Sequence, residues 1–272
     1  MRCVVSGNPV YAYTGARRFE ATLPTLAFVH GAANDHSVWA LQARYFAHHG
    51  RNVLALDLPG HGRSGGEAPA SVEAAAEWLM ALLDTLGVSQ AGLVGHSLGA
   101  LVVLEAARRH PESVTRIALL GPAAPMPVAD VLLDAARVND HLAYELIAGW
   151  SFSAQDQLGG NPMPGVWMLG NALRLMERSR PGVLYTDLLA CHRYAGGLSA
   201  AAGIRCPALL LLGQRDLMAP AKNATALIAA FADQRVVTIA DCGHSLMTEA
   251  PDVVLDALRD FVSATASLRS ST

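Results

Sequence analysis

Ser97 lies within Gly95-His96-Ser97-Leu98-Gly99, between an apolar run that ends at Val94 and a run of helix-forming residues. A strand that turns abruptly into a helix holds its corner residue in a strained backbone conformation and pushes the side chain outwards. The residues two positions before and after the corner then approach each other and the neighbouring backbone, so glycine is required at both. The spacing therefore predicts an exposed serine hydroxyl beside the positive end of a helix.

A serine hydroxyl becomes an effective nucleophile when a base removes its proton, and the base needs a third group to fix its tautomer. Asp216 follows the apolar run 209–212 by a short turn, and His244 follows the run that ends near Ile239. Both would lie with Ser97 at the carboxyl edge of a parallel sheet, where such sheets bind ligands. The pattern predicts Ser97 as nucleophile, His244 as base and Asp216 as the acid that orients it.

Other acidic residues and histidines near these positions have simpler interpretations. Asp241 lies three residues before His244 and is expected to be a turn residue. Asp57 ends an earlier apolar run and is expected to bond within the following loop, while His96 packs at the corner and His30 supports its own loop. The remaining histidines are expected at the surface or in loops: His36, His48, His49, His61, His110, His141 and His192.

A tetrahedral intermediate carries a negative oxygen that needs two hydrogen-bond donors. The backbone N–H of Leu98, directly after the nucleophile, is one candidate. The second is expected from the loop that follows the strand ending at Val29, at Ala32 or, as the alternative, at Ala33. These groups form the predicted oxyanion hole.

The elements that must position these residues alternate between buried strands and helices. Continuous apolar runs are typical of strands covered on both faces, and strands that alternate with helices predict right-handed crossovers in a parallel sheet. Two short apolar stretches near the start of the chain are candidates for antiparallel edge strands. The predicted strands cover 3–5, 10–13, 26–29, 52–58, 91–96, 114–120, 207–212 and 235–239.

The alternation stops at Gly121 and resumes near Gly203, and only helical patterns lie between. Residues 122–202 are therefore predicted to be a helical cap or lid, and residues 1–121 and 203–272 a core domain. Candidate helices cover 128–139, 141–148, 168–178 and 184–194. The expected substrate contacts are Trp39, Trp150, Trp167, Met168 and Leu217. Most of the cap arginines are expected to face solvent: Arg174, Arg178, Arg180 and Arg193.

Composition excludes several classes of protein. The 272 residues are 52% hydrophobic and 16% charged, with a net charge of -3 and no cluster of Lys and Arg, so we expect no binding of nucleic acid. The four cysteines have no zinc-ligand spacing, and we expect neither metal nor cofactor. No apolar run approaches the ~18 residues of a membrane span, and the first 20 residues lack the apolar segment of a signal peptide. We expect a cytoplasmic protein.

Together these motifs resemble the α/β-hydrolase superfamily, in its capped branch of esterases and lactonases. The resemblance covers nearly the whole chain except the insertion. It implies an eight-stranded, mostly parallel sheet, a cap after the sixth strand and hydrolysis without a cofactor. It also implies the roles predicted above for the triad and the oxyanion hole. The residues that carry it are His30-Gly31 with Trp39 downstream, Asp57-Leu58-Pro59-Gly60-His61-Gly62-Arg63-Ser64, Gly95-His96-Ser97-Leu98-Gly99, Gly213-Gln214-Arg215-Asp216 and Gly243-His244.

The predicted function is that of a serine hydrolase acting on a small-to-medium, largely apolar ester, lactone or thioester. Epoxide hydrolases and haloalkane dehalogenases of the superfamily carry an aspartate where this chain has Ser97, and plant hydroxynitrile lyases carry a lysine where it has Ser245. Two alternatives remain: a C–C bond hydrolase of aromatic meta-cleavage products, and a ligand receptor or signalling protein with an intact triad. The expected partner is a small-molecule substrate, with the protein either a monomer or a homodimer.

Overall fold

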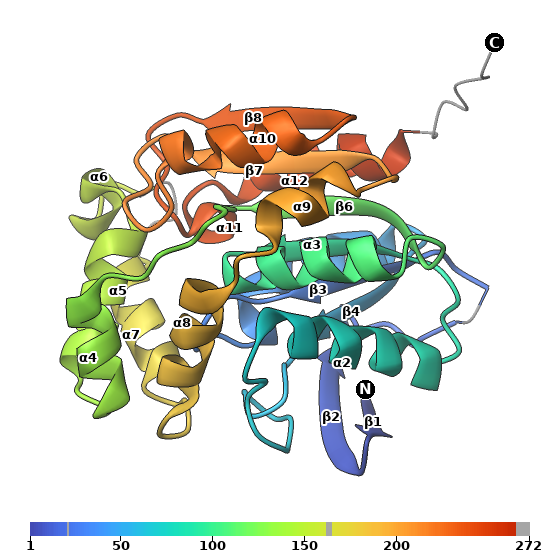
Figure 1. Ribbon diagram of the computed structural model, residues 1–272, viewed down its shortest axis with the longest axis horizontal. Coiled ribbons are helices and arrows are strands. Elements are labelled where there is room, and N and C mark those ends of the chain that lie inside the picture. The colour runs from blue at the N-terminus through green and yellow to red at the C-terminus, as the bar shows by residue number, and fades with distance from the viewer. Residues whose placement is uncertain (21, 162–164, 265–272) are drawn as a thin grey trace.

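An eight-stranded sheet forms the centre of the protein (Figure 1). The computed structural model describes residues 1–20, 22–161 and 165–264. The strands lie in the order β1-β2-β4-β3-β5-β6-β7-β8; β1 and β2 pair antiparallel, β2 pairs antiparallel with β4, and all later pairings are parallel. The predicted mostly parallel sheet with antiparallel edge strands is confirmed. The bounds are β1 Arg2–Val5, β2 Asn8–Tyr13, β3 Thr25–Val29, β4 Asn52–Leu56, β5 Ala91–His96, β6 Val114–Leu120, β7 Ala208–Gly213 and β8 Gln234–Ile239.

Helices cover both faces of this sheet. In Figure 1, α2, α3, α9 (Gly197–Ala202) and α10 lie in front of the strands and α12 lies behind them. The helix α1 packs against α12 and β4. Among the described residues the helices of the core are η1 His36–Trp39, α1 Ala40–His48, α2 Val72–Thr85, α3 Leu98–Arg109, η2 Ala221–Ala224, α10 Thr225–Ala230, α11 Leu246–Glu249 and α12 Pro251–Ser263.

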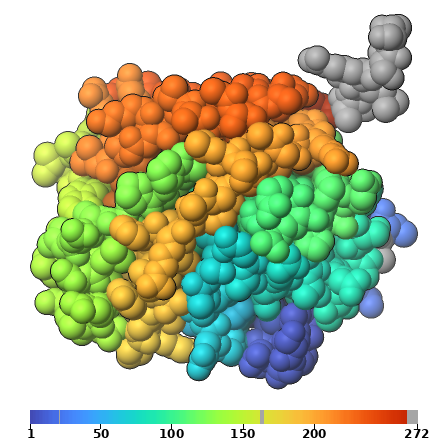
Figure 2. Space-filling model, in the orientation of Figure 1, coloured from blue at the N-terminus to red at the C-terminus, as the bar shows by residue number. Residues whose placement is uncertain are grey.

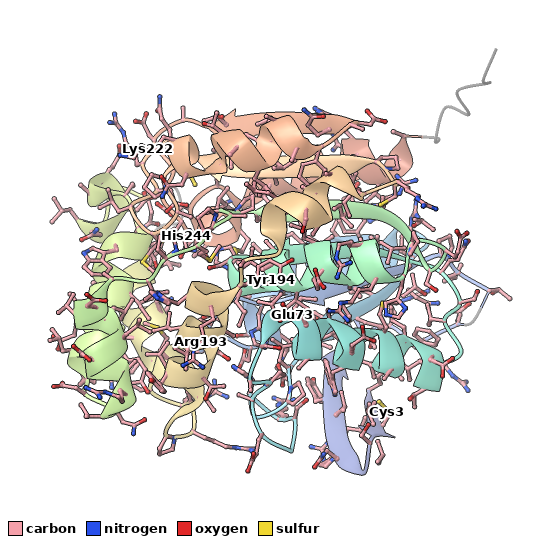
Figure 3. All side chains as sticks on the ribbon, viewed as in Figure 1. Cys3, Glu73, Arg193, Tyr194, Lys222 and His244 are labelled. Atoms are coloured by element: carbon pink, nitrogen blue, oxygen red, sulfur yellow. The ribbon has the colours of Figure 1, made fainter. Side chains whose placement is uncertain are left out.

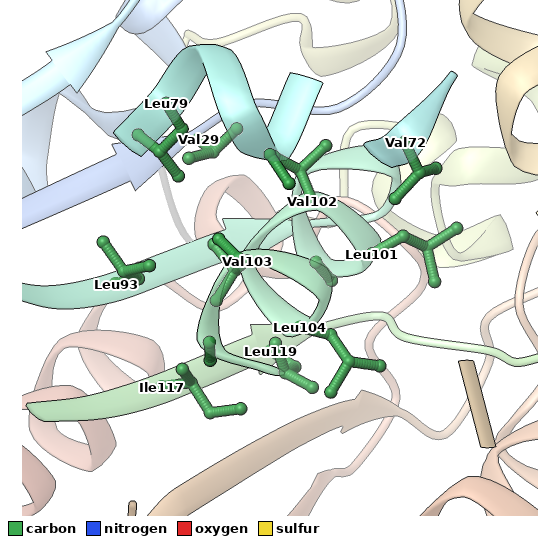
Figure 4. Packing of buried hydrophobic residues seen from close by; sticks show 14 of the residues in the cluster. Val29, Val72, Leu79, Leu93, Leu101, Val102, Val103, Leu104, Ile117 and Leu119 are labelled. Carbon is green, nitrogen blue, oxygen red and sulfur yellow. The ribbon is translucent and has the colours of Figure 1, made fainter. Parts of the chain in front are cut away.

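Alternate residues of each central strand enter two different cores. On β3, Ala27 and Val29 belong to the cluster beneath α2 and α3, whereas Leu26 and Phe28 belong to the cluster beneath α1 and α12. Successive side chains of a strand point to opposite faces, and both faces here are covered by helices. Figure 4 shows α3 inside the first cluster, with its aliphatic side chains against those of β5 and β6. The helix that follows Ser97 is thereby held rigidly.

An insertion of helices separates β6 from β7. It contains α4 Asp130–Arg137, α5 Leu142–Ser151, α6 Ala154–Gln157, α7 Met168–Met176, α8 Val183–Arg193 and α9 Gly197–Ala202. The first five gather at the left of Figure 1, beside the end at which β6 leaves the sheet, and Figure 2 shows them covering that end of the molecule. Four of them, α4, α5, α7 and α8, share a third apolar cluster, which includes Leu132, Met176 and Leu188. The last helix, α9, packs against α3 and α10 instead.

The helix starts follow from local capping. The Ser71 side chain accepts a hydrogen bond from the backbone N–H of Ala74 at 3.1 Å, as its place before α2 predicts. Of the two possible caps for the helix after β3, Asp35 is the one used, because it accepts from the N–H of Ser37 at 2.8 Å. That helix begins as the 3₁₀ turn η1. The predicted end of the last helix at Thr265 lies outside the described residues.

Candidate active site

Ser97 occupies the corner between β5 and α3 with φ 53° and ψ −116°. Such a conformation is costly for a residue other than glycine, about 1–3 kcal/mol, and is kept only where the surroundings enforce it. Here the N–H of Ser97 donates to the carbonyl of Leu120 at 2.9 Å, which ties the corner to β6. A Cβ on Gly95 would overlap the carbonyl oxygen of Gly99, as predicted from the spacing. The serine side chain lines a cavity at the sheet edge.

His244 and Asp216 form a buried hydrogen-bonded pair. The Nδ1 of His244 lies 2.7 Å from Oδ2 of Asp216, and the two side chains are 5% and 1% exposed. The other oxygen, Oδ1, accepts from the N–H groups of Met218 at 2.8 Å and Ala219 at 2.7 Å. Burial alone would raise the pKa of Asp216, but the charge and hydrogen bond of His244 and the backbone donors lower the pKa below its usual value. Asp216 is therefore an ionised acceptor with a fixed orientation.

The other nitrogen of His244 is free to act on a proton. Since a carboxylate can only accept, Nδ1 carries the hydrogen and Nε2 of the neutral ring presents a lone pair. That Nε2 is buried and has no hydrogen-bond partner among the described residues. His244 and Ser97 line the same cavity, although no hydrogen bond joins them within the described part of the chain. The arrangement can deliver a base to the nucleophile when a substrate is bound.

Asp241 does not contact His244 through its side chain. It occupies a turn with φ 52° and forms an exposed ion pair with Arg215 at 3.3 Å. Asp57 accepts from the N–H groups of His36 and Arg63, each at 2.8 Å, and so bonds within its own loop. Both arrangements agree with the interpretations made from the sequence.

One backbone N–H group at the corner and one in the loop after β3 remain available for an oxyanion. Neither Ala32 nor Leu98 donates its N–H to any residue of the described ranges. The alternative donor, Ala33, is occupied, because its N–H donates to Oδ2 of Asp187 at 2.9 Å. Ala32 lines the cavity with Ser97, and Leu98 begins α3, where the first N–H groups have no partner within the helix. The geometry favours the pair Ala32 and Leu98 over Ala33.

The cavity beside Ser97 has a volume of about 470 Å³ and walls that are mostly apolar. The insertion contributes its apolar side chains, among them Met126, Leu132, Ile147, Trp150, Met176 and Leu188. Lys222 is the only lining residue with a side chain charged at neutral pH, histidines aside, among those described. The cavity therefore suits an uncharged, apolar group next to the nucleophile.

Of the five expected substrate contacts, Trp150 and Leu217 line this cavity. The other three do not line it, and for Trp39 and Trp167 the expectation is corrected. Trp39 is fully buried and packs its ring 5.3 Å from that of Phe28, because it ends η1 beneath the sheet. Trp167 is 65% exposed, since it precedes the first turn of α7 and covers Gly170 from outside. Met168 is buried and lines a second cavity along α7 rather than the one beside Ser97.

A buried ion pair next to the oxyanion loop was not foreseen from the sequence, which placed His61 among surface or loop histidines. His61 is 2% exposed, and its Nε2 lies 2.8 Å from Oδ2 of Asp187, a residue of α8. Burial alone would lower the pKa of His61, but the charge and hydrogen bond of Asp187 raise the pKa above its usual value. The same oxygen accepts from Ala33, and the Ser179 hydroxyl donates to the Ala33 carbonyl at 3.2 Å. The insertion thus holds both backbone groups of Ala33.

A second buried carboxylate joins the insertion to the loop that carries His244. Oε2 of Glu249 accepts from the N–H of Ser153 at 2.8 Å and from that of Gly243 at 3.0 Å. The carbonyl of Ser151 accepts from the N–H of His244 at 2.8 Å. Burial, together with the neighbouring Asp156, raises the pKa of Glu249 to about 7. No spacing in the sequence signals the contact between the insertion and this loop, because 96 residues separate Ser153 from Glu249.

His30 and His96 are buried supports. The Nε2 of His30 accepts from the N–H of Leu58 at 3.1 Å and its Nδ1 donates to the carbonyl of Gly31 at 2.8 Å. The Nε2 of His96 donates to the carbonyl of His244 at 2.8 Å. Burial lowers the pKa of His30 to about 4 and that of His96 to about 3, so both rings are neutral at physiological pH. Each supports a loop, as expected.

One cluster among the described residues brings carboxylates and a histidine together: Asp35, His36 and Asp57. Oδ1 of Asp57 accepts from the His36 backbone and ring, and Oδ1 of Asp35 caps η1. These hydrogen bonds account for the cluster as support for the loop. None of the described helices is long and apolar enough to cross a membrane.

Comparisons with known proteins give a consistent result. The family model of the α/β-hydrolase fold matches residues 24–251. The pimeloyl-[acyl-carrier protein] methyl ester esterase of Aromatoleum aromaticum is 31% identical over 254 residues, which cover 88% of this chain and 98% of that protein. The (E)-2-((N-methylformamido)methylene)succinate hydrolase of Acinetobacter baylyi is 25% identical over 88% of this chain and 90% of its own. The crystal structure of an enol-lactonase from Burkholderia xenovorans superimposes with a TM-score of 0.84, at 23% identity, covering 97% of this chain and all of the other.

Proposed function

This chain belongs to the α/β-hydrolase fold family, and we propose that it is a serine hydrolase that cleaves a carboxylic ester, lactone or thioester through an acyl-enzyme on Ser97. The observation that carries the proposal is the environment of His244. One ring nitrogen is bonded to the buried carboxylate of Asp216, and the other is unpartnered among the described residues, in the cavity that Ser97 also lines. A neutral histidine held in this tautomer is the base that a serine nucleophile needs.

The proposed reaction uses the site in two halves. The Ser97 oxygen attacks the carbonyl carbon while His244 Nε2 takes the hydroxyl proton, and the N–H groups of Ala32 and Leu98 bind the developing oxyanion. The imidazolium, stabilised by Asp216, then passes its proton to the leaving alcohol or thiol. Water attacks the acyl-enzyme by the same route and releases the acid, which restores Ser97.

The proposed substrate is small to medium in size and largely apolar on one side. The apolar walls of the 470 Å³ cavity support this, since each methylene group buried there contributes about 0.8 kcal/mol. The two relatives compared above are named as a methyl ester esterase and as the hydrolase of a substituted succinate, and the first name supports an ester substrate.

We also propose that residues 122–202 act as a cap over the sheet edge. The position of α4 to α8 beside the end of β6, and their contribution of most of the cavity wall, support this role. The buried contacts of Asp187 and Glu249 with the core support a cap that is docked on the catalytic loops.

Activity assays with 4-nitrophenyl esters of increasing acyl length test the proposal. The wild-type protein should turn over short esters repeatedly, and Ser97→Ala should lose about 10⁴-fold or more in kcat. Ser89→Ala, which removes an exposed hydroxyl from the loop between α2 and β5, is the matched control and should retain activity. Near-normal activity of folded Ser97→Ala would refute the proposal.

The same assays distinguish the two alternatives. A C–C hydrolase would turn over an aromatic ring-fission product faster than any ester of the series. A receptor with an intact triad would show one stoichiometric burst of nitrophenol without sustained turnover. Sustained ester hydrolysis supports the serine hydrolase over both.

A further inference from the structure

We propose that a second cavity, which adjoins the catalytic one, binds an anionic group carried by the substrate; this inference rests on the proposed function. The second cavity has a volume of about 320 Å³ and lies along α7. It shares four lining residues with the catalytic cavity, so the two meet beside Ser97: Asn34, His96, Ala172 and Ser245. A substrate whose ester lies at Ser97 can therefore extend into both.

The lining of the second cavity differs in charge from that of the first. Arg174 on α7 and Arg178 in the turn directly after that helix both line the second cavity. Arg174 pairs with Glu177 at 2.7 Å, whereas the Arg178 side chain has no ion pair or hydrogen bond with any residue in the described ranges. No acidic side chain lines this cavity among the described residues. An anion bound there would meet the Arg178 guanidinium directly and would share that of Arg174 with Glu177.

A buried, unpartnered acceptor marks the junction of the two cavities. His96 is 4% exposed and its Nε2 donates to the His244 carbonyl, which leaves Nδ1 of the neutral ring as an acceptor. That Nδ1 has no partner among the described residues. A Cβ on residue 31 would lie 2.9 Å from it, so Gly31 leaves open the space before this nitrogen. A hydroxyl or N–H of a ligand placed there would satisfy a buried group that otherwise costs about 1–3 kcal/mol.

The two cavities thus assign different chemistry to the two halves of the substrate. The half in the catalytic cavity is apolar, and the half in the second cavity is polar and carries a carboxylate or a phosphate. Guanidinium groups bind carboxylates and phosphates through the same paired N–H donors, so an experiment must distinguish which of these anions the cavity prefers.

The test compares anionic and neutral esters of matched shape. On the alcohol side the pairs are 4-carboxyphenyl butyrate or 4-phosphonooxyphenyl butyrate against phenyl butyrate. On the acyl side the pair is 4-nitrophenyl hydrogen adipate against 4-nitrophenyl hexanoate. The quantity measured is the ratio of kcat/KM for the anionic ester to that for the neutral one. Comparison of the three anionic esters identifies which anion, on which side of the ester, gives the highest kcat/KM ratio.

Charge removal locates the effect. We expect Arg174→Ala/Arg178→Ala to lower the highest ratio by about three- to tenfold, with little change for the neutral ester, since partly exposed charge pairs are weak and screened. Added NaCl should lower the wild-type ratio for the same reason. Arg193→Ala removes an exposed cap arginine that lines neither cavity and should leave the ratio and the basal activity unchanged. Figure 3 shows Arg193 and Lys222 on different elements, on opposite sides of His244.

Three results would overturn the second cavity as an anion site. The first is that no anionic ester is preferred over its neutral partner, and the second is that the kcat/KM ratio is unchanged in the double arginine variant. The third is that the ratio falls equally in Lys222→Ala, which would place the anion site in the first cavity. Calorimetry on Ser97→Ala gives a readout that does not need turnover. There 4-butyramidobenzoate should bind about three- to tenfold more tightly than butyranilide. Where the ester series places the anion on the alcohol side, equal dissociation constants would refute the site, while turnover of neutral esters alone would leave the proposed function standing.

Discussion

Removal of the Asp187 carboxylate should weaken both the fold and the oxyanion hole. This side chain is 2% exposed and accepts from the His61 ring at 2.8 Å and from the Ala33 N–H at 2.9 Å. In Asp187→Ala both partners stay buried without an acceptor. Breaking a buried charged pair costs about 3–5 kcal/mol, and loss of a proton from His61 reduces that cost. We therefore expect the free energy of unfolding to fall by about 3 kcal/mol.

The effect on catalysis follows from the position of Ala33 next to Ala32. Once its N–H is released, the loop can shift the Ala32 donor relative to the oxyanion. A displaced donor should lower kcat by about 10- to 100-fold with KM little changed, because the oxyanion forms only in the transition state. A purely structural role would leave kcat unaltered wherever the variant is fully folded.

The assay combines urea unfolding followed by circular dichroism with 4-nitrophenyl butyrate kinetics. Asp134→Ala is the matched control, since it removes a carboxylate from an exposed pair with Arg137 and should cost less than about 1 kcal/mol. The raised pKa of His61 means that its charged pair stabilises the fold fully below about pH 6.5 and less as the pH rises through the folded pKa. The stability difference between wild type and Asp187→Ala should therefore shrink at alkaline pH. This reasoning would be refuted by an equal loss in the free energy of unfolding for Asp187→Ala and Asp134→Ala, or by an unchanged kcat in folded Asp187→Ala.

Three further predictions follow from the site. Asp216→Asn should lower kcat about 10⁴-fold and Asp241→Asn about twofold or less. A larger loss in Asp241→Asn than in Asp216→Asn in steady-state kinetics would show that Asp216 is not the acid. The pKa of Glu249 is raised from 4.5 to about 7 in the folded state, so its contribution to the free energy of unfolding should decline as the pH rises from 4.5 to 7. Urea unfolding at pH 5 and pH 8 should show this decline in the wild type and not in Glu249→Gln. Across acyl lengths, kcat/KM should rise a few-fold per methylene and then fall, and Leu132→Trp should move the optimum to shorter chains.

The sequence predicted most of the features that depend on local pattern. Strand β3 and the corner at Ser97 are short-range signals, because an apolar run and two glycines fix them within ten residues. Asp216 could be placed near His244 because both follow parallel strands, whose carboxyl ends share one edge of a sheet.

What the sequence could not predict depends on distant partners. His61 looks like a loop histidine until α8 brings Asp187, 126 residues later, against it. Trp39 lies close in sequence to the oxyanion loop, yet the turn η1 directs it beneath the sheet. The helix α11 has four residues, too few to show a helical period.

The central claim is that Ser97 is the nucleophile, activated by His244. The most direct measurement is intact-protein and peptide mass spectrometry after reaction with a fluorophosphonate. One phosphonyl group per chain is expected, on the peptide that contains Ser97, with labelling abolished in Ser97→Ala and much slowed in His244→Ala. A modified serine elsewhere, or rapid labelling that persists in folded Ser97→Ala, would contradict the account.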